Sequence, residues 1–150
     1  MQDFRELRVW GRAHSFALDV GRAARAFPRT GYSELKSQII RAADSIVSNI
    51  VEGAGAATRK EFARFLDISI KSASEVDYRL ELARDNGVLP YRVWKQLALE
   101  VVEIRKMLFA LRRAILRADH LSGKHSPPGR ANGSDSKRFR DDSGGPETDD

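Results

Sequence analysis

The residues whose types and spacing best suit chemistry lie in one helix-like stretch, 41–53, where polar side chains interrupt an apolar pattern. An apolar face at spacings of three and four residues is marked by Ile39, Ala42 and Ile46. Asn49 continues that face, Glu52 follows it, and Gly53 is placed to end the helix. Buried amides and carboxylates need partners, so these groups could line a ligand or catalytic pocket, or they could fix helix register. Because a core Asn often fixes register, we predict that Arg41, Asn49 and Glu52 form a structural polar layer.

The side chains that usually carry catalysis or bind metals are few and unfavourably spaced. The chain has no cysteine, which excludes disulfides, thiolate zinc sites and cysteine nucleophiles. None of the three histidines, His14, His120 and His125, lies four residues from a Glu, Asp or another His, the spacing that would place two metal ligands on one helix face. The Glu-x-x-His pair of di-iron bundles and the glycine loop of nucleotide-binding proteins are both missing from the sequence. We therefore predict no catalytic residue, no metal, no cofactor and no enzymatic activity.

Basic residues outnumber acidic ones, and the excess is unevenly distributed. Residues 1–118 contain 21 Lys and Arg against 14 Asp and Glu, whereas residues 119–150 contain 5 against 7. Two helix faces collect cations, one with Arg5, Arg8 and Arg12 and one with Lys106, Arg113 and Arg117. Both sets are predicted to bind nucleic acid, mainly through electrostatics. The alternative is that they only keep the surface solvated, with the second set complementing a helix dipole.

Four segments with apolar residues at alternating spacings of three and four must position these groups. Their approximate limits are 3–27, 33–53, 58–86 and 90–118. Asp3 is a good N-cap for the first segment, and Thr58 and Glu61 form a capping box at the start of the third. Helices of this length joined by short turns must alternate in direction. We therefore predict an all-α, antiparallel up-down-up-down four-helix bundle over residues 3–118.

The same spacing predicts which side chains form the core. The expected stripes are Trp10, Ala13, Ala17, Val20, Ala24 and Phe27 in the first helix, Phe62, Leu66, Ser69, Ala73, Val76, Leu80 and Ala83 in the third, and Leu97, Val101, Ile104, Leu108, Leu111 and Ile115 in the fourth. Several large apolar residues fall outside these stripes, namely Phe4, Leu7, Leu18, Ile68 and Val102. So many surplus apolar residues predict a second buried surface, most simply the subunit interface of a homo-oligomer.

The composition changes after Ala118. Residues 125–150 are mostly small or polar, with Phe139 as the only large apolar side chain, so we predict that 119–150 is a disordered tail. A short basic cluster, Lys137–Arg140, lies within it beside Asp141 and Asp142. The N-terminus lacks the apolar segment of a signal peptide, and no apolar run is long enough to span a bilayer. We therefore expect a cytoplasmic protein without a membrane partner.

Several separate motifs resemble those of one family. They are the segments Phe4–Trp10, Tyr32–Ala43, 41–53 and Lys60–Leu66, together with Glu75. In these the chain is similar, over roughly residues 3–116, to the small bacterial four-helix bundle proteins encoded in intervening sequences of the 23S ribosomal RNA gene. The resemblance implies a four-helix bundle that assembles as a homopentamer. A related branch, the accessory variability determinants of diversity-generating retroelements, binds nucleic acid and a reverse transcriptase, which implies an adaptor for such a polymerase as the alternative function.

Overall fold

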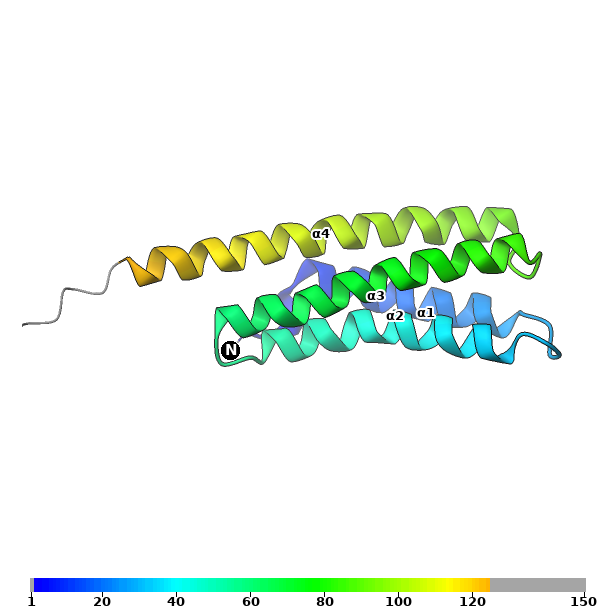
Figure 1. The fold of residues 1–150 in the computed structure, drawn as a ribbon, viewed down its shortest axis with the longest axis horizontal. Coiled ribbons are helices and arrows are strands. Elements are labelled where there is room, and N and C mark those ends of the chain that lie inside the picture. The colour runs from blue at the N-terminus through cyan, green and yellow to red at the C-terminus, as the bar shows by residue number, and fades with distance from the viewer. Residues whose placement is uncertain (1, 125–150) are drawn as a thin grey trace, which may run out of the picture.

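The computed structural model describes residues 2–124, which form four α-helices joined by short turns (Figure 1). A 3-10 turn, η1 (Phe4–Glu6), precedes α1 (Arg8–Arg25), α2 (Ser33–Ala54), α3 (Arg59–Asp85) and α4 (Tyr91–Gly123). Each helix packs on its neighbours in sequence, and α1 also packs on α4, which closes the bundle. No strand occurs in this described part of the chain, and the predicted all-α four-helix bundle is confirmed.

Polar contacts between adjacent helices show that they run in opposite directions. Ser45 of α2 contacts Ser72 of α3 at 2.8 Å between their hydroxyl oxygens. Gln38, earlier in α2, accepts a hydrogen bond at 2.6 Å from Arg79, which lies later in α3. The starts of α1 and α3 therefore lie at the same end of the bundle as the ends of α2 and α4 (Figure 1).

The first predicted helix is interrupted near its start. Asp3 does act as an N-cap, because its carboxylate accepts from the Arg5 N–H at 3.0 Å, but it caps only η1. Leu7 then adopts an extended backbone, with φ −78° and ψ 119°, so α1 begins at Arg8. This break lets Leu7 enter the core and Phe4 pack against it. Both had been counted as surplus apolar residues, so the predicted second surface loses two of its members.

The core follows the predicted stripe best in α3. All seven of its predicted positions are buried, including Ser69, whose hydroxyl donates to the Ile46 carbonyl at 2.9 Å. The stripe in α1 is partly wrong, since Val9 and Phe16 are buried whereas Trp10 and Ala17 are only half-buried. The apolar face of this helix is wide, and spacing alone does not fix which edge of it faces the core.

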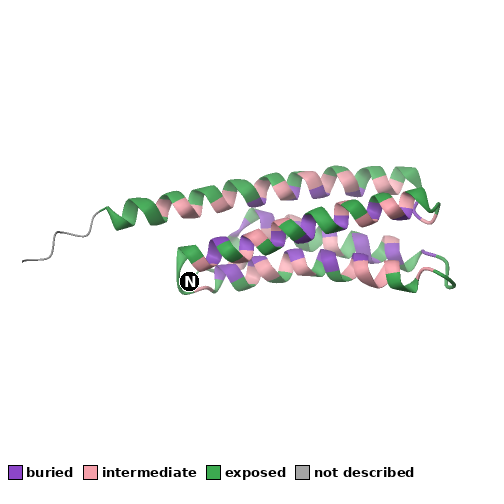
Figure 2. Ribbon diagram, in the orientation of Figure 1, coloured by how far each residue is buried: buried purple, intermediate pink, exposed green. Residues whose placement is uncertain are grey.

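α4 extends beyond the ends of the other helices (Figure 1). No residue after Leu108 in this helix is buried, and the predicted core residues Leu111 and Ile115 are only half-buried (Figure 2). Residues 119–123, predicted to be tail, continue α4, while 125–150 lie outside the described residues. The physical reason for the exposure is that α4 projects beyond the helices on which it packs, so its last turns have no neighbouring helix among the described residues to cover them (Figure 1).

Gly53 does not end α2, contrary to the sequence prediction. The helix continues to Ala54 and is capped by Gly55, whose N–H donates to the Val51 carbonyl at 3.2 Å. Gly53 is buried against α3, and a β-carbon placed on it would lie 2.6 Å from Cδ2 of Phe62. The missing side chain therefore allows the Phe62 ring to pack directly on the backbone of α2.

Candidate nucleic-acid interface

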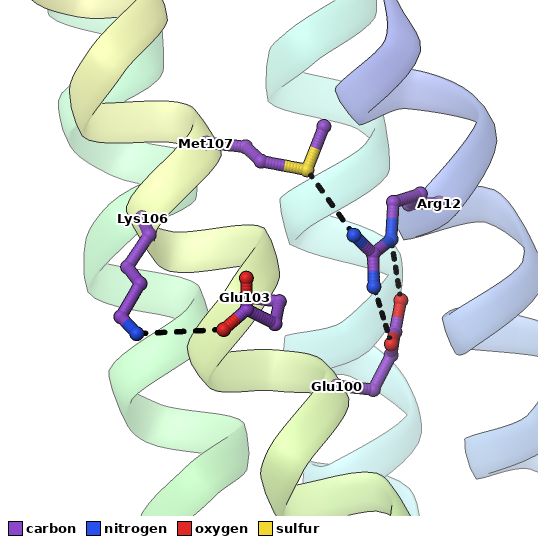
Figure 3. Close-up of polar contacts among 5 residues, drawn as sticks. All are labelled: Arg12, Glu100, Glu103, Lys106 and Met107. Carbon is purple, nitrogen blue, oxygen red and sulfur yellow. Dashed lines mark hydrogen bonds and ion pairs between the residues drawn. The ribbon is translucent and has the colours of Figure 1, made fainter.

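Arg12 makes a partly exposed contact between two helices of the bundle. Its guanidinium donates two hydrogen bonds to Glu100 of α4, at 2.9 Å from Nε and 2.7 Å from Nη2 (Figure 3). Its Nη1 also faces the Met107 sulfur at 3.7 Å. Glu100 raises the pKa of the Arg12 guanidinium, first through these hydrogen bonds and then through Coulombic attraction. Arg12 therefore ties α1 to α4, and the prediction that it binds nucleic acid has to compete with this contact.

The other cations of the two predicted sets lie on the surface. Arg5 pairs with Asp3 at 3.4 Å, and Lys106 pairs with Glu103 at the same distance one turn away. Arg8 is exposed and has no carboxylate within 4.0 Å among the described residues. Exposed pairs of this kind contribute little stability and exchange easily for other anions. Arg5, Arg8 and Lys106 are thus less committed to a partner than Arg12, whose guanidinium makes two hydrogen bonds to Glu100.

Arg113 and Arg117 lie on the exposed last turns of α4, as their spacing predicted. The fold adds two cations that the sequence reasoning missed, Lys60 and Arg64, from the first turns of α3. Lys60 and Arg64 lie near the last part of α4, because the first turns of α3 pack alongside it in the antiparallel bundle. The antiparallel topology was itself predicted, so pairing the start of one helix with the end of the next could have identified them. We call Lys60, Arg64, Arg113 and Arg117 the α3–α4 basic patch.

Two hollows shape this patch and share Leu116 between them. The first, about 650 Å³, lies between α3 and α4 and includes Lys60 and Arg64 in its walls. The second, about 430 Å³, lies on α4 and is lined by Arg113, Leu116, Arg117, His120 and Leu121. Asp67 in the first hollow already binds Arg112 through both carboxylate oxygens. Among the described residues, none of the four patch cations has a carboxylate within ion-pair distance, so their charge is available to an external anion.

The predicted polar layer is only partly present. Asn49 is half-buried, and its amide donates to the Ser45 carbonyl at 2.8 Å and to the Ser45 hydroxyl at 3.1 Å. The Ser45 hydroxyl in turn contacts Ser72 of α3, which links the two helices. Arg41 and Glu52 are exposed, because they lie on the outer side of α2, and they do not join this network. The Asn–Ser–Ser chain satisfies its own polar groups, which is typical of a structural contact rather than a catalytic one.

Asp77 of α3 is the one described carboxylate whose titration is clearly altered. Burial raises its pKa, while the attraction of Arg105, 3.8 Å away on α4, opposes the rise and Glu81 adds to it. The net shift is upward even though a cation is close, so the effect of burial on this carboxylate exceeds the attraction of Arg105.

Each tryptophan lies in the first turns of a helix beside a nitrogen-bearing side chain. Trp10 of α1 stacks on His14, with ring centroids 5.0 Å apart and an interplanar angle of 9°. Trp94 of α4 lies under the guanidinium of Arg84, 4.1 Å from the ring centroid. Both indole N–H groups are buried without a hydrogen-bond partner among the described residues. These contacts stabilise helix ends and offer no chemistry of their own.

Residues 2–124 contain no group of three or more His, Asp or Glu side chains that could hold a metal ion. None of the helices described is both long enough and apolar enough to cross a bilayer.

Comparisons with known proteins place the chain in a family. A solved structure from Bacteroides thetaiotaomicron, described as a protein with unknown function from the S23 ribosomal protein family, is 25% identical in sequence, with a TM-score of 0.66. The match covers 70% of this chain and 95% of that one. No curated protein matches the chain. The family model for the 23S rRNA-intervening sequence protein matches residues 5–110, and the chain therefore belongs to the 23S rRNA-intervening sequence protein family.

Proposed function

We propose that this chain is a non-enzymatic, homo-oligomeric protein that binds RNA or DNA mainly through electrostatics. The observation that carries the proposal is the α3–α4 basic patch, where four exposed cations on two helix ends lack a carboxylate partner among the described residues. Cations held on rigid helices can follow a phosphate backbone without reading base sequence. Little sequence preference and a strong dependence on salt are the expected signs.

Assembly is the second part of the proposal, and the outer face of α4 supports it. Leu99, Val102 and Phe109 recur there at spacings of three and seven, away from the core stripe of the same helix. Leu99 is 62% exposed and Phe109 is 44% exposed, which is unusual for large apolar side chains repeated along one face. A symmetric oligomer would bury this stripe and multiply the weak phosphate contacts. The family resemblance supports a homopentamer.

Binding is tested by gel-shift titration of the full chain with single-stranded RNA and with duplex DNA at two salt concentrations. Replacing the four patch cations by Gln should weaken binding and lower the slope of log K against log salt by about 0.7–0.9 per lost phosphate contact. The matched control replaces Arg25, Arg29, Arg92 and Lys95, four exposed cations at the opposite end of the bundle, by Gln. If both variants lower the affinity for nucleic acid equally, the patch contributes only through its net charge and is not a specific binding surface. If the intact oligomer produces no gel shift at low salt, the proposal that it binds nucleic acid is wrong.

Assembly is tested by light scattering during size-exclusion chromatography. Leu99→Glu together with Phe109→Glu should release monomers, while Tyr78→Glu, at a comparably exposed position on α3, should not. If the unmodified chain is a monomer at micromolar concentration, the proposed oligomer is wrong. If it is a stable dimer or tetramer, only the proposed pentamer is wrong.

A protein-interaction adaptor, for a polymerase such as a reverse transcriptase, is the alternative function. The same outer stripe of α4 favours it, because an amphipathic helix of another protein could cover these residues as well as a second copy could. A monomer that binds no nucleic acid would favour the adaptor over the leading proposal.

A further inference from the structure

We propose that the acidic segment 141–150 of this same chain docks on the α3–α4 basic patch and competes there with external anions. This segment contains Asp141, Asp142, Glu147, Asp149 and Asp150 and no Lys or Arg. The patch presents four cations that lack carboxylate partners among the described residues, on the two helix ends nearest to where α4 stops. Docking does not require nucleic acid, whereas the competition that follows from it rests on the proposed function.

The surface suits an extended acidic peptide better than a compact ligand. The hollow between α3 and α4 is an open trough with Lys60 and Arg64 in one wall and Leu116 in the other. The second hollow shares Leu116 with the first and is lined by Arg113 and Arg117. The cations thus line two adjoining hollows, and a chain with carboxylates along its length can contact both. Glu61 and Asp67 also line the trough, but Asp67 is engaged by Arg112, so Glu61 is the one opposing charge there without such a partner.

Covalent connection favours this patch over the cations at the other end of the bundle. Sixteen residues, 125–140, separate the described chain from the acidic segment, and they span at most about 50–58 Å. Arg113 lies ten residues before Gly123 in α4, which corresponds to about 15 Å along the helix. The start of α4, Tyr91, lies 32 residues before Gly123, or about 48 Å, which takes most of that span. The near patch therefore requires far less extension of the connecting residues than the far end does.

The tether also sets how strongly the segment competes. A short intramolecular connection gives an effective concentration of about 1 mM. If five carboxylates on four cations bind with a dissociation constant of roughly 0.1–1 mM, docking lowers the apparent affinity of a competing polyanion by about 2- to 10-fold. Salt weakens both interactions, so the effect of the segment is largest at low ionic strength and fades as screening increases.

Carbodiimide cross-linking of the full chain tests docking directly, because it joins carboxylates to lysine amines only when they are in contact. Lys60 is the lysine of the patch, and Lys36 and Lys95, at the opposite end of the bundle, are the matched controls. Cross-links from 141–150 to Lys60 should exceed those to either control and should fall in about 0.5 M salt, where the Debye length is only a few Å. Equal yields at the three lysines, or no cross-link to Lys60, would overturn the proposal.

A mixture of isotopically heavy and light chains separates docking on the same chain from docking on another copy. Cross-links that join heavy to light chains would overturn the intramolecular arrangement. The competition is tested by replacing the five acidic residues by Asn and Gln in the full chain, which should raise affinity for RNA about 2- to 10-fold at low salt. Unchanged affinity in a protein that still binds RNA would overturn the competition. A protein that binds no RNA but forms the Lys60 cross-link would contradict only the proposed function.

Discussion

Breaking the contact between Arg12 and Glu100 should loosen the bundle without weakening nucleic-acid binding. This expectation contrasts with the interpretation of Arg12 as a phosphate-binding residue, which its spacing from Arg5 and Arg8 suggested. Arg12→Gln and Glu100→Gln keep much of the side-chain volume and remove the charge. Each leaves the other charged group half-buried and without its partner, so both single variants should lose stability.

The size of the expected stability loss follows from the exposure and hydrogen bonding of the two side chains. The side chains of Arg12 and Glu100 are 41% and 34% exposed, so solvent screens their attraction and the full value of a buried pair does not apply. The two parallel hydrogen bonds place this pair at the upper end of the range for exposed pairs, at about 1 kcal/mol of coupling. For a domain of this size, a loss of 1 kcal/mol lowers Tm by roughly 3–5 °C. The α1–α4 contact is the least extensive between neighbouring helices, which makes the loss easier to detect.

The assay is urea unfolding of the two single variants and the double variant at one fixed protomer concentration, since assembly shifts apparent stability. Arg8→Gln is the matched control, because Arg8 lies one turn earlier on α1 and is exposed. It should leave the free energy of unfolding nearly unchanged. A double-mutant coupling below about 0.2 kcal/mol would refute the tie. An Arg12→Gln variant of normal stability that loses affinity for RNA would restore Arg12 to the binding surface.

Two further changes test packing and charge inside the bundle. Gly53→Ala should cost about 1–3 kcal/mol, because its β-carbon would overlap the Phe62 ring, while Gly55→Ala, where the nearest atom lies at 3.6 Å, should cost much less in the same urea titration. Asp77→Asn should raise Tm at pH 7, because burial outweighs the attraction of Arg105 in the folded state. Since the folded pKa of Asp77 is raised, ionisation of this group costs stability as pH rises through that pKa. The advantage of Asn should therefore vanish below the unfolded pKa. Equal stability of the two glycine variants, or a constant Tm difference over the acid range, would contradict these explanations.

The sequence predicted the parts of the fold that depend on regular spacing. The α3 stripe was fully predicted because seven apolar or small residues recur on one narrow face between a threonine cap and an Asn-Gly stop. In α1 the predicted set of buried residues was partly wrong, because Val9 and Trp10 are adjacent and either could begin the buried stripe. The extended residue at Leu7 was not predictable, since no proline or glycine there marks a break.

The candidate site was harder to predict because it depends on contacts between helices. The spacing placed Arg12 on one helix face with Arg5 and Arg8, but the extended backbone at Leu7 separates Arg5 from α1. Nothing local showed that Glu100, far away in the sequence, faces Arg12. Gly53 was interpreted through its own helix as a stop signal, whereas its role depends on the Phe62 ring of another helix. Lys60 and Arg64 were overlooked for the same reason, since they form a patch only with the end of α4.

The two tryptophans give the protein a pair of built-in optical probes. Trp10 and Trp94 are the chain's two indoles, and they lie in the first turns of antiparallel helices, so they sample different levels of the α1–α4 pair. The Trp10 ring stacks on His14 of the same helix, and the Trp94 ring lies under the guanidinium of Arg84 from α3. A change in either contact therefore alters the surroundings of one indole and hence its emission. Separation of α1 from α4 can thus be followed by intrinsic tryptophan fluorescence, without an added label.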